Sequence, residues 1–422
     1  MVKRAAAYAN YKAGQLDPHR YTAIAASCDQ IINNIWDDEF PLDVIQGGAG
    51  TSSNMNANEV IASLANRQLG VKPGQSDQVH PNDHVNMSQS TNDVYPSACR
   101  LAILLSHDAL DSHLKGLVAA FRAKGIEFND VIKLGRTQLQ DAVPMTLGQE
   151  FAAFATTLAE DIERAREIVS MLKEIHLGGT AIGTALNAPP EYRELAINEL
   201  SRLCGIDLRS SSDLIEANWD TGAFVLYSGM LKRTATKLSK ISNDLRLLSS
   251  GPRGGIGEIL LPDRQPGSSI MPGKVNPVIP ELMNQVCFQV IGNDLAVTFA
   301  AEAGQLQLNA MEPLIVFNIL MSQKLLTNGV RTLTERCIIG IEANKDRCRL
   351  HLDRSTGLIT ALVPLIGYER ATLVAKRVLE SGLSVSDVLA QSGLGKGEEM
   401  QTLLDPYRMV SGMGGSGKSI VE

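Results

Sequence analysis

The stretch from Gly267 to Pro277 combines residue types that can bind an anion and move a proton. It reads Gly-Ser-Ser-Ile-Met-Pro-Gly-Lys-Val-Asn-Pro, so two hydroxyls, an ammonium group and an amide fall close together. Glycine and proline disfavour regular structure here, and the last proline favours a helix start at Val278. Backbone N–H groups at a helix start and the nearby Lys274 suit a negatively charged ligand. The alternative is a surface turn with incidental serines, because such loops are common.

Two further polar segments could supply uncharged hydrogen-bond donors. Thr51 follows Gly-Ala-Gly, whose small residues let a ligand approach the backbone closely. Ser90, Thr91 and Asn92 form a polar run whose side chains cannot all face a core. Taken alone, this run could equally be a helix N-cap or an Asx turn, and Asp93 could serve the same purpose. The residues by themselves leave both interpretations open.

These segments together resemble the motifs of the fumarase/aspartase superfamily, lyases that eliminate ammonia, water or an amine to give fumarate. The pattern Gly-Ser-Ser-x-Met-Pro-x-Lys-x-Asn at 267–276 resembles the signature loop of that family. Blocks at 48–60, 80–93 and 135–144 resemble its other motifs, in the expected order. The match extends from the first residues to about Pro406, so agreement by chance is negligible.

The resemblance implies a mainly α-helical, three-domain fold with a central long-helix bundle that is shared in a homotetramer. We expect an N-terminal domain at 1–92 that lacks its usual first segment. A central bundle at 93–346 would carry the mobile catalytic loop 267–277. A small helical domain with a disordered tail would follow at 347–422.

Apolar spacing predicts long helices without reference to any relative. Their expected ranges are 98–124, 146–175, 222–248, 278–303 and 313–343. The alanine-rich residues 1–10 also predict a helix. Helices of this length exceed the globular mean of roughly 12 residues, which indicates a bundle or an oligomeric core.

Elimination of ammonia beside a carboxylate requires a base, a site for the departing amine, and stabilisation of a doubly negative aci-carboxylate. The last requirement dominates, because charge develops on carboxylate oxygens and needs preorganised donors. Neutral hydroxyls and amides suit this task, since their bonds strengthen toward the transition state without fixing the ground state as a salt bridge would.

Carried over position by position, the resemblance assigns a role to each polar residue of the motifs. The residues implied to bind the β-carboxylate are Thr51, Ser90, Thr91 and Ser269. Those implied to bind the α-carboxylate are Lys274 and Asn276, and those around the amino group are Asn92, Thr137 and Gln138. Ser268 is implied to be the general base. A serine can act so only where loop N–H groups, the helix start and Lys274 stabilise its alkoxide.

Position 138 separates branches of the family. Class II fumarases resemble this segment but carry a histidine there, paired with an acid. Gln138 cannot shuttle protons, but it can hydrogen-bond around an amine. The expected reaction is therefore that of the aspartase branch, reversible conversion of L-aspartate to fumarate and ammonia without a cofactor. A class II fumarate hydratase is the alternative enzyme, and a non-catalytic structural homologue, as the lens crystallins of this superfamily are, is the alternative of another class.

Composition argues against several other functions. The 46 acidic and 39 basic residues give a net charge of −7 with no basic tract, which disfavours nucleic-acid binding. The six cysteines are scattered without a C-x-x-C pair, which disfavours a disulfide framework or a zinc site. No metal-ligand cluster with catalytic spacing is evident, and His176 is expected to be structural.

Two remaining features bear on location and on nucleotide binding. No signal peptide precedes Met1 and no apolar run approaches membrane-spanning length, so we expect a cytoplasmic protein. Residues 412–419 match a phosphate-binding loop letter for letter. Such a loop requires a following helix, and only three residues remain, so we expect no nucleotide there.

Overall fold

The structure, a computed structural model, describes residues 1–72, 77–267, 270–392 and 404–411. Its internal contacts divide the chain into two compact units, which are described separately. Unit 1 comprises residues 1–112, 161–236 and 286–327, and unit 2 comprises 113–160, 237–285 and the chain from Asn328 onward. The described chain is mainly α-helical, as the sequence predicted. The three-domain division of the sequence stays a prediction.

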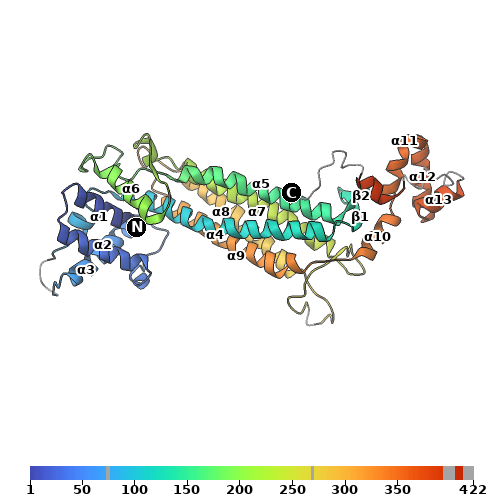
Figure 1. The fold of residues 1–422 in the computed structure, drawn as a ribbon, viewed down its shortest axis with the longest axis horizontal. Coiled ribbons are helices and arrows are strands. Elements are labelled where there is room, and N and C mark those ends of the chain that lie inside the picture. The colour runs from blue at the N-terminus through green and yellow to red at the C-terminus, as the bar shows by residue number, and fades with distance from the viewer. Residues whose placement is uncertain (73–76, 268–269, 393–403, 412–422) are drawn as a thin grey trace. The chain divides into compact units, whose positions relative to one another are not determined.

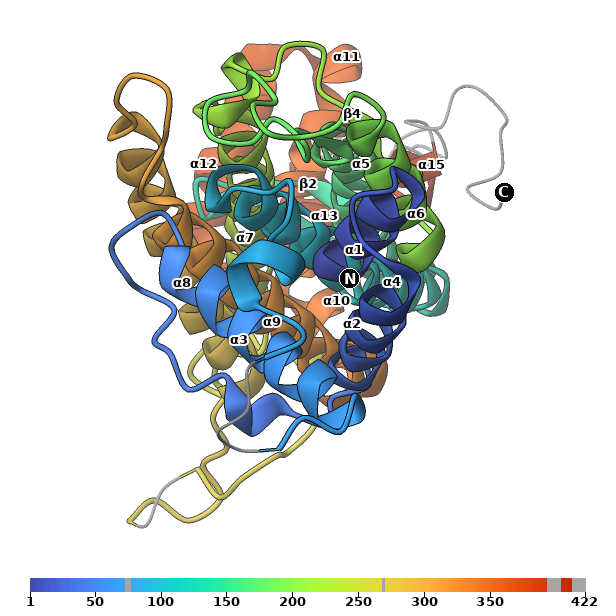
Figure 2. The same cartoon turned by 90° about the vertical axis from the view of Figure 1, so that its left-hand side faces the viewer.

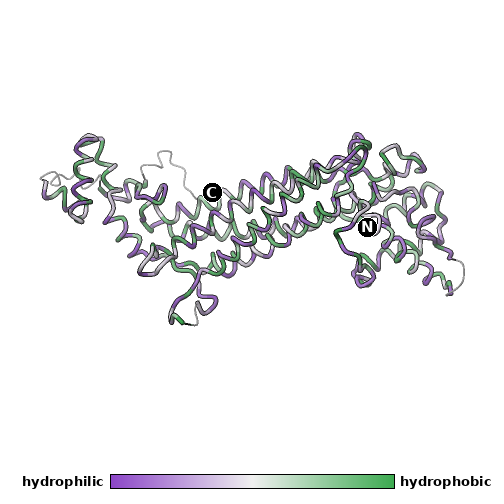
Figure 3. Tube along the Cα trace, turned by 180° about the vertical axis from the view of Figure 1, so that it is seen from behind, coloured by the Kyte–Doolittle hydropathy of each residue, from purple (hydrophilic) through white to green (hydrophobic). Residues whose placement is uncertain are grey.

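Five long helices of the described chain contribute residues to both units. They are α4 (Thr91–Glu127), α5 (Leu147–Leu172), α7 (Gly222–Leu248), α8 (Val278–Glu302) and α9 (Glu312–Arg336). Within each unit their segments lie side by side as a bundle (Figure 1). Polar and apolar residues alternate along them, as Figure 3 shows, which is typical of helices packed on one side.

The expected helix ranges agree with the structure to within three residues except at one N-terminal and two C-terminal ends. The helix expected at 98–124 begins earlier, at Thr91. The helix expected at 146–175 ends at Leu172, because Glu174–Ile175 form a short strand, β3, that pairs in parallel with β4 (Arg209–Ser210). The helix expected at 313–343 ends at Arg336. It is followed by the 3₁₀ turn η4 (Ile338–Gly340) and the strand β6 (Glu342–Ala343).

The N-terminal part of unit 1 is a cluster of helices, seen side by side in Figure 2. It contains α1 (Val2–Lys12), α2 (Pro18–Ile32), α3 (Thr51–Gln68) and α6 (Tyr192–Cys204), with the short turns η1 (Asp37–Glu39) and η2 (Pro81–Val85). Unit 1 also includes the turn η3 (Glu216–Asn218), between β4 and α7. Asp17 begins α2, because its carboxylate accepts hydrogen bonds from the N–H groups of His19 and Arg20. Apolar residues including Ile24 and Ile61 form the shared core.

Buried polar contacts fix the helices of unit 1 against one another. Gln323 of α9 donates to the Ile103 carbonyl of α4 at 3.0 Å and to the Tyr227 hydroxyl of α7 at 2.7 Å. His107 of α4 contacts the same hydroxyl through Nδ1 at 2.9 Å. Such directional bonds restrict how three apolar helix faces can slide, so they specify the register of the bundle.

Unit 2 combines its bundle segments with a hairpin and a group of short helices. The hairpin is β1 (Ile132–Thr137) with β2 (Gln140–Thr146), and a second antiparallel pair joins β5 (Ile259–Leu260) to β6. The short helices are α10 (Lys345–Asp353), η5 (Gly357–Leu362), α11 (Val363–Ile366), α12 (Tyr368–Ser381), α13 (Val385–Gln391) and α15 (Pro406–Ser411). Ile132 and Leu134 of the hairpin share one hydrophobic core with these helices.

All six cysteines are within the described residues, and none of them forms a disulfide. None of the helices in the described ranges is both long and apolar enough to cross a membrane.

We predict that Gly148 is required for the close approach of α5 to α4 in unit 2. A Cβ at this position would collide with the Gly125 carbonyl oxygen and lie 2.7 Å from Asn129 Cα. Gly148→Ala should therefore lower the free energy of unfolding by about 1–3 kcal/mol, measured by urea denaturation. Gly116→Ala is the control, because nothing lies within 4 Å of its Cβ, and it should stabilise by about 0.5–1 kcal/mol. Similar effects of both substitutions would contradict the prediction.

Candidate active site

Ser90, Thr91 and Asn92 lie at the start of α4 in unit 1. The Ser90 hydroxyl accepts a hydrogen bond from the Asn92 N–H at 3.2 Å, so it caps the helix. Ser90 can therefore cap the helix and also donate to a ligand, because capping uses the oxygen of its hydroxyl and not the hydrogen. Asn92 uses its amide nitrogen to donate to the Ala181 carbonyl at 2.8 Å. The amide oxygen of Asn92 is then the group that can accept from an amine.

The carboxylate of Asp93 holds the backbone of this run in place through hydrogen bonds. It is fully buried and accepts from the N–H of Ser90 at 2.9 Å, of Gly178 at 2.9 Å and of Thr180 at 3.0 Å. Burial raises the pKa of Asp93 to about 6, although these bonds and the charge of Lys3 act in the opposite direction. Thr180 has a φ of 57°, an unfavourable value for a β-branched residue, and the bond to Asp93 helps to hold it.

His176 supports the same segment and has the structural role expected of it. Its Nε2 donates to the Asn92 carbonyl at 2.7 Å, and its ring is almost completely buried. Burial lowers the pKa of His176 to about 4, so the ring is neutral at physiological pH. His176 therefore fixes the backbone of Asn92 without adding a charge.

Thr51 begins α3 directly after a left-handed segment of backbone. Gly48 and Gly50 have φ values of 84° and 85°, and a Cβ at Gly50 would overlap the ring of Tyr95 in α4. The start of α3 thus lies against the first turns of α4, near Thr91. The hydroxyl of Thr51 donates to the Gly48 carbonyl at 2.7 Å, so it must rotate to donate to a ligand.

Thr137 and Gln138 lie at the tip of the β1–β2 hairpin in unit 2. Thr137 pairs with Gln140, so the loop has two residues, Gln138 and Leu139, with φ values of 53° and 61°. Positive φ at both positions identifies a type I′ turn, which glycine or asparagine normally favours. Two larger residues in this conformation cost energy, and the turn holds the Gln138 side chain out into solvent. The sequence contained no signal for this turn.

The loop that carries Lys274 and Asn276 is closed at its neck. The Asn276 side-chain nitrogen donates to the Gly267 carbonyl at 3.0 Å. A Cβ at Gly267 would overlap the carbonyl of Lys274, so only glycine fits this approach. Helix α8 then begins at Val278, directly after Pro277, as predicted. The expected base Ser268 and the expected carboxylate ligand Ser269 lie outside the described residues.

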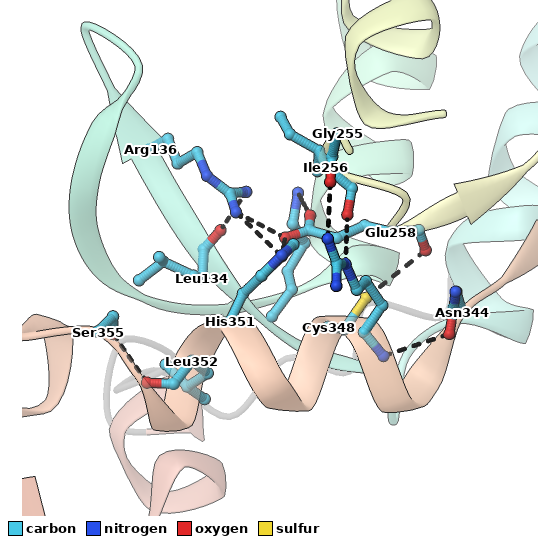
Figure 4. A network of polar contacts seen from close by, with 12 residues as sticks. Leu134, Arg136, Gly255, Ile256, Glu258, Asn344, Cys348, His351, Leu352 and Ser355 are labelled. Carbon is cyan, nitrogen blue, oxygen red and sulfur yellow. Dashed lines mark hydrogen bonds and ion pairs between the residues drawn. The ribbon is translucent and has the colours of Figure 1, made fainter. Parts of the chain in front are cut away.

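A buried carboxylate, Glu258, joins the hairpin to the segment that leads into this loop (Figure 4). Its Oε1 lies 2.8 Å from Arg136 Nη2 and 2.9 Å from His351 Nδ1, and its Oε2 lies 3.1 Å from Lys133 Nζ. Lys133 also pairs with Glu150 at 2.6 Å. Burial alone would raise the pKa of Glu258, but Lys133, Arg136 and His351 together hold it below its ordinary value.

Sequence reasoning missed Glu258 because its partners are far apart along the chain. Arg136 directly precedes Thr137, and Glu258 directly precedes β5, from which the chain continues to Gly267. The ion pair therefore fixes the hairpin near its tip to the segment that leads into the loop. Among the described residues, no group of three or more His, Cys, Asp or Glu side chains is arranged to hold a metal ion.

We predict that Glu258→Gln lowers the free energy of unfolding by about 3–5 kcal/mol at pH 7, because it leaves the largely buried Arg136 without a counter-charge and Lys133 with Glu150 alone. The folded pKa lies below the ordinary 4.5, so the stabilisation is complete above that pH and is lost as pH falls through the lower folded value. Urea denaturation from pH 7 to pH 3 should thus show that the difference in free energy of unfolding between parent and variant becomes smaller as the pH falls.

Glu127→Gln is the matched control, since it removes an exposed partner of Lys124. It should change the free energy of unfolding by less than about 1 kcal/mol. The role given to Glu258 would be contradicted if Glu258→Gln had the same free energy of unfolding as the parent at pH 7. It would also be contradicted if the difference between the two became larger on acidification.

Comparison with known proteins places this geometry in a family. Residues 1–292 match the family model described as "Lyase", and residues 358–411 match that described as "Fumarase C C-terminus". The chain is 59% identical over 412 residues to an aspartate ammonia-lyase of Pseudomonas fluorescens. This alignment covers 97% of this chain and 86% of that protein.

Two solved structures have the same fold. The cobalt-bound crystal structure of the fumarate lyase:delta crystallin of Brucella melitensis has a TM-score of 0.94 and 61% identity, over 97% of this chain and 88% of that one. Recombinant class II fumarase of Schistosoma mansoni has a TM-score of 0.93 and 35% identity, over the same shares of the two chains. The motifs, the long-helix fold and these matches agree. The chain therefore belongs to the lyase family of the fumarase/aspartase superfamily.

Proposed function

We propose that this chain is an ammonia-lyase that converts L-aspartate reversibly to fumarate and ammonia. The observation that carries the proposal is the similarity to aspartate ammonia-lyase over nearly the whole chain, which greatly exceeds the similarity to class II fumarase. Gln138 supports the same conclusion. It lies exposed at the hairpin tip, where an amide can bind an amine but cannot transfer protons as a histidine would.

In the proposed mechanism Ser268 removes a proton from Cβ of L-aspartate. The C–H electron pair moves into the β-carboxylate and forms the aci-carboxylate, which then returns the pair to form the C=C bond as the C–N bond breaks. The donors proposed to stabilise the β-carboxylate are Thr51, Ser90, Thr91 and Ser269. Those proposed for the α-carboxylate are Lys274 and Asn276, and those for the amino group are Asn92, Thr137 and Gln138. The loop 267–277 would exclude water when it closes.

The same proposal includes a cytoplasmic homotetramer of three-domain subunits that shares its active sites between subunits. Support comes from α8, where Phe288, Leu295 and Phe299 share one side of the helix and are 59%, 58% and 65% exposed. An apolar stripe of this size normally contacts another protein surface. Helices of further copies would cover it and complete a common bundle.

The reaction itself can be tested with the purified full-length chain. Fumarate should accumulate, seen by its ultraviolet absorbance, when L-aspartate is added, with release of an equal amount of ammonia. L-Asparagine and L-malate are the controls and should give no fumarate. Turnover of L-malate would instead indicate a fumarate hydratase, and thermal stabilisation by L-aspartate without turnover would indicate a non-catalytic homologue.

Shared sites and the role of Ser268 can be tested by subunit mixing. Ser268→Ala removes the proposed base and Thr91→Val removes a proposed carboxylate donor, so each should lower kcat by about 10²-fold or more. When the two variant oligomers are dissociated, mixed and reassembled, sites with neither defect should form and activity should return. Thr22→Val, which changes an exposed threonine of α2, is the control and should keep full activity.

Two outcomes of the mixing experiment would contradict this account. Full activity of Ser268→Ala would exclude it as the base. No recovery after mixing, although size-exclusion chromatography shows mixed oligomers, would mean that each site belongs to a single subunit.

A further inference from the structure

The hydroxyl of Thr91 has one hydrogen-bond partner in the described chain, Asn54 of α3. The side-chain nitrogen of Asn54 lies 3.0 Å from Thr91 Oγ1 and 3.2 Å from Asn86 Oδ1. A hydroxyl can either donate or accept, so this contact alone does not say where the hydrogen of Thr91 points. The answer depends on which end of the Asn54 amide faces Thr91.

Lys3 decides the orientation of the amides around it. Its ammonium group, which has no acceptor, lies 2.9 Å from Asn86 Oδ1 and 2.9 Å from Gln89 Oε1. The Gln89 amide nitrogen donates to the carbonyls of Val85 and Met87, at 2.9 and 3.0 Å, so its oxygen must face Lys3. The Asn86 amide nitrogen donates to the Gln89 carbonyl at 3.3 Å, so Asn86 must likewise present its oxygen to Lys3. Burial lowers the pKa of Lys3 to about 7, but these bonds fix both amides whether or not Lys3 is charged.

The orientation of Asn54 follows from that of Asn86. Because Asn86 presents an oxygen, Asn54 must present its NH₂ group, and the two hydrogens of that group go to Asn86 and to Thr91. Thr91 is then an acceptor within the fold, and its own hydrogen is left to donate elsewhere. The opposite atom, Asn54 Oδ1, is buried without a partner. The fold thus tolerates an unsatisfied acceptor in order to direct a donor at Thr91.

We propose that Asn54 is a positioning residue that makes the Thr91 hydroxyl a donor to the substrate carboxylate. The proposal rests on the function proposed above, in which Thr91 stabilises the charge that develops on the β-carboxylate. Asn54 does not touch the substrate in this account. It acts through Thr91, and Lys3 and Asn86 act through Asn54.

The decisive variant is Asn54→Asp, which keeps the shape of the side chain but replaces the NH₂ donor with an acceptor. The Thr91 hydroxyl should then turn toward the new carboxylate and be lost to the substrate. The value of kcat/KM for L-aspartate should fall by about 10²-fold, the usual effect of removing one such donor, with most of the loss in kcat. Asn54→Ala offers Thr91 no new acceptor and should lose less.

Asn58→Asp is the matched control. Asn58 lies one turn further along α3, is fully buried, and donates to the same Asn86 oxygen at 3.2 Å. Within the described chain its side chain does not hydrogen-bond to Thr91. It introduces the same charge into the same network, so general electrostatic and folding effects should be similar. Its kcat/KM should stay within about fivefold of the parent value. Thermal unfolding of each variant reports whether the fold is retained.

A double-mutant cycle separates positioning from a purely structural role. In a Thr91→Val background there is no hydroxyl to turn, so Asn54→Asp and Asn54→Ala should cause little further loss of kcat. A structural role predicts the same loss in both backgrounds, and a greater loss for Asn54→Ala than for the isosteric Asn54→Asp. Either result, or an Asn54→Asp variant as active as the parent, would overturn the proposal.

The test still decides for or against the proposal if Asn54→Asp does not fold or if the parent protein is inactive. If Asn54→Asp does not fold, Asn54→Ala in the two backgrounds gives the same comparison, and equal losses in both overturn the proposal. A parent protein without turnover of L-aspartate contradicts the proposed function, and with it the inference. An active parent with an unaffected Asn54→Asp variant contradicts the inference alone.

Discussion

Buried charges that lie behind uncharged donors are the interaction on which the described site depends. Lys3 orients Asn86, Asn54 and so Thr91. Asp93 binds the backbone of Ser90 and of the loop that supports Asn92. Glu258 holds Arg136, next to Thr137 and Gln138. Lys3 and Asp93 thus fix neutral groups of the proposed site, and Glu258 fixes the residue next to two others.

This arrangement suits a substrate whose negative charge increases during the reaction. A cation that contacted both carboxylates directly would bind the ground state and the transition state with similar strength, which would not accelerate the chemical step. Hydroxyls and amides bind the ground state more weakly, and their bonds strengthen as charge moves onto oxygen. Because Lys3, Asn86 and Asn54 orient the Thr91 hydroxyl before substrate arrives, this donor needs little reorganisation at the moment of reaction.

Local patterns in the sequence predicted much of this fold and of the candidate site. Apolar spacing located the long helices, and Pro277 located the start of α8, because these signals depend on neighbouring residues. Pairing between distant segments was not predictable in this way. The early ends of α5 and α9, the hairpin tip at Gln138–Leu139 and the ion pairs of Glu258 all depend on partners far along the chain. Resemblance supplied the residues that are proposed to face the substrate, whereas the buried residues behind them emerged only from the contacts.

The central claim is that the site is preorganised for a doubly negative aci-carboxylate. Its most direct test compares the dissociation constants of two inhibitors, succinate and ionised 3-nitropropionate, whose nitronate resembles the aci-carboxylate in charge and shape. We expect the nitronate to bind at least about 10²-fold more tightly than succinate, as transition-state analogues do. Equal affinity for the two compounds would contradict the account.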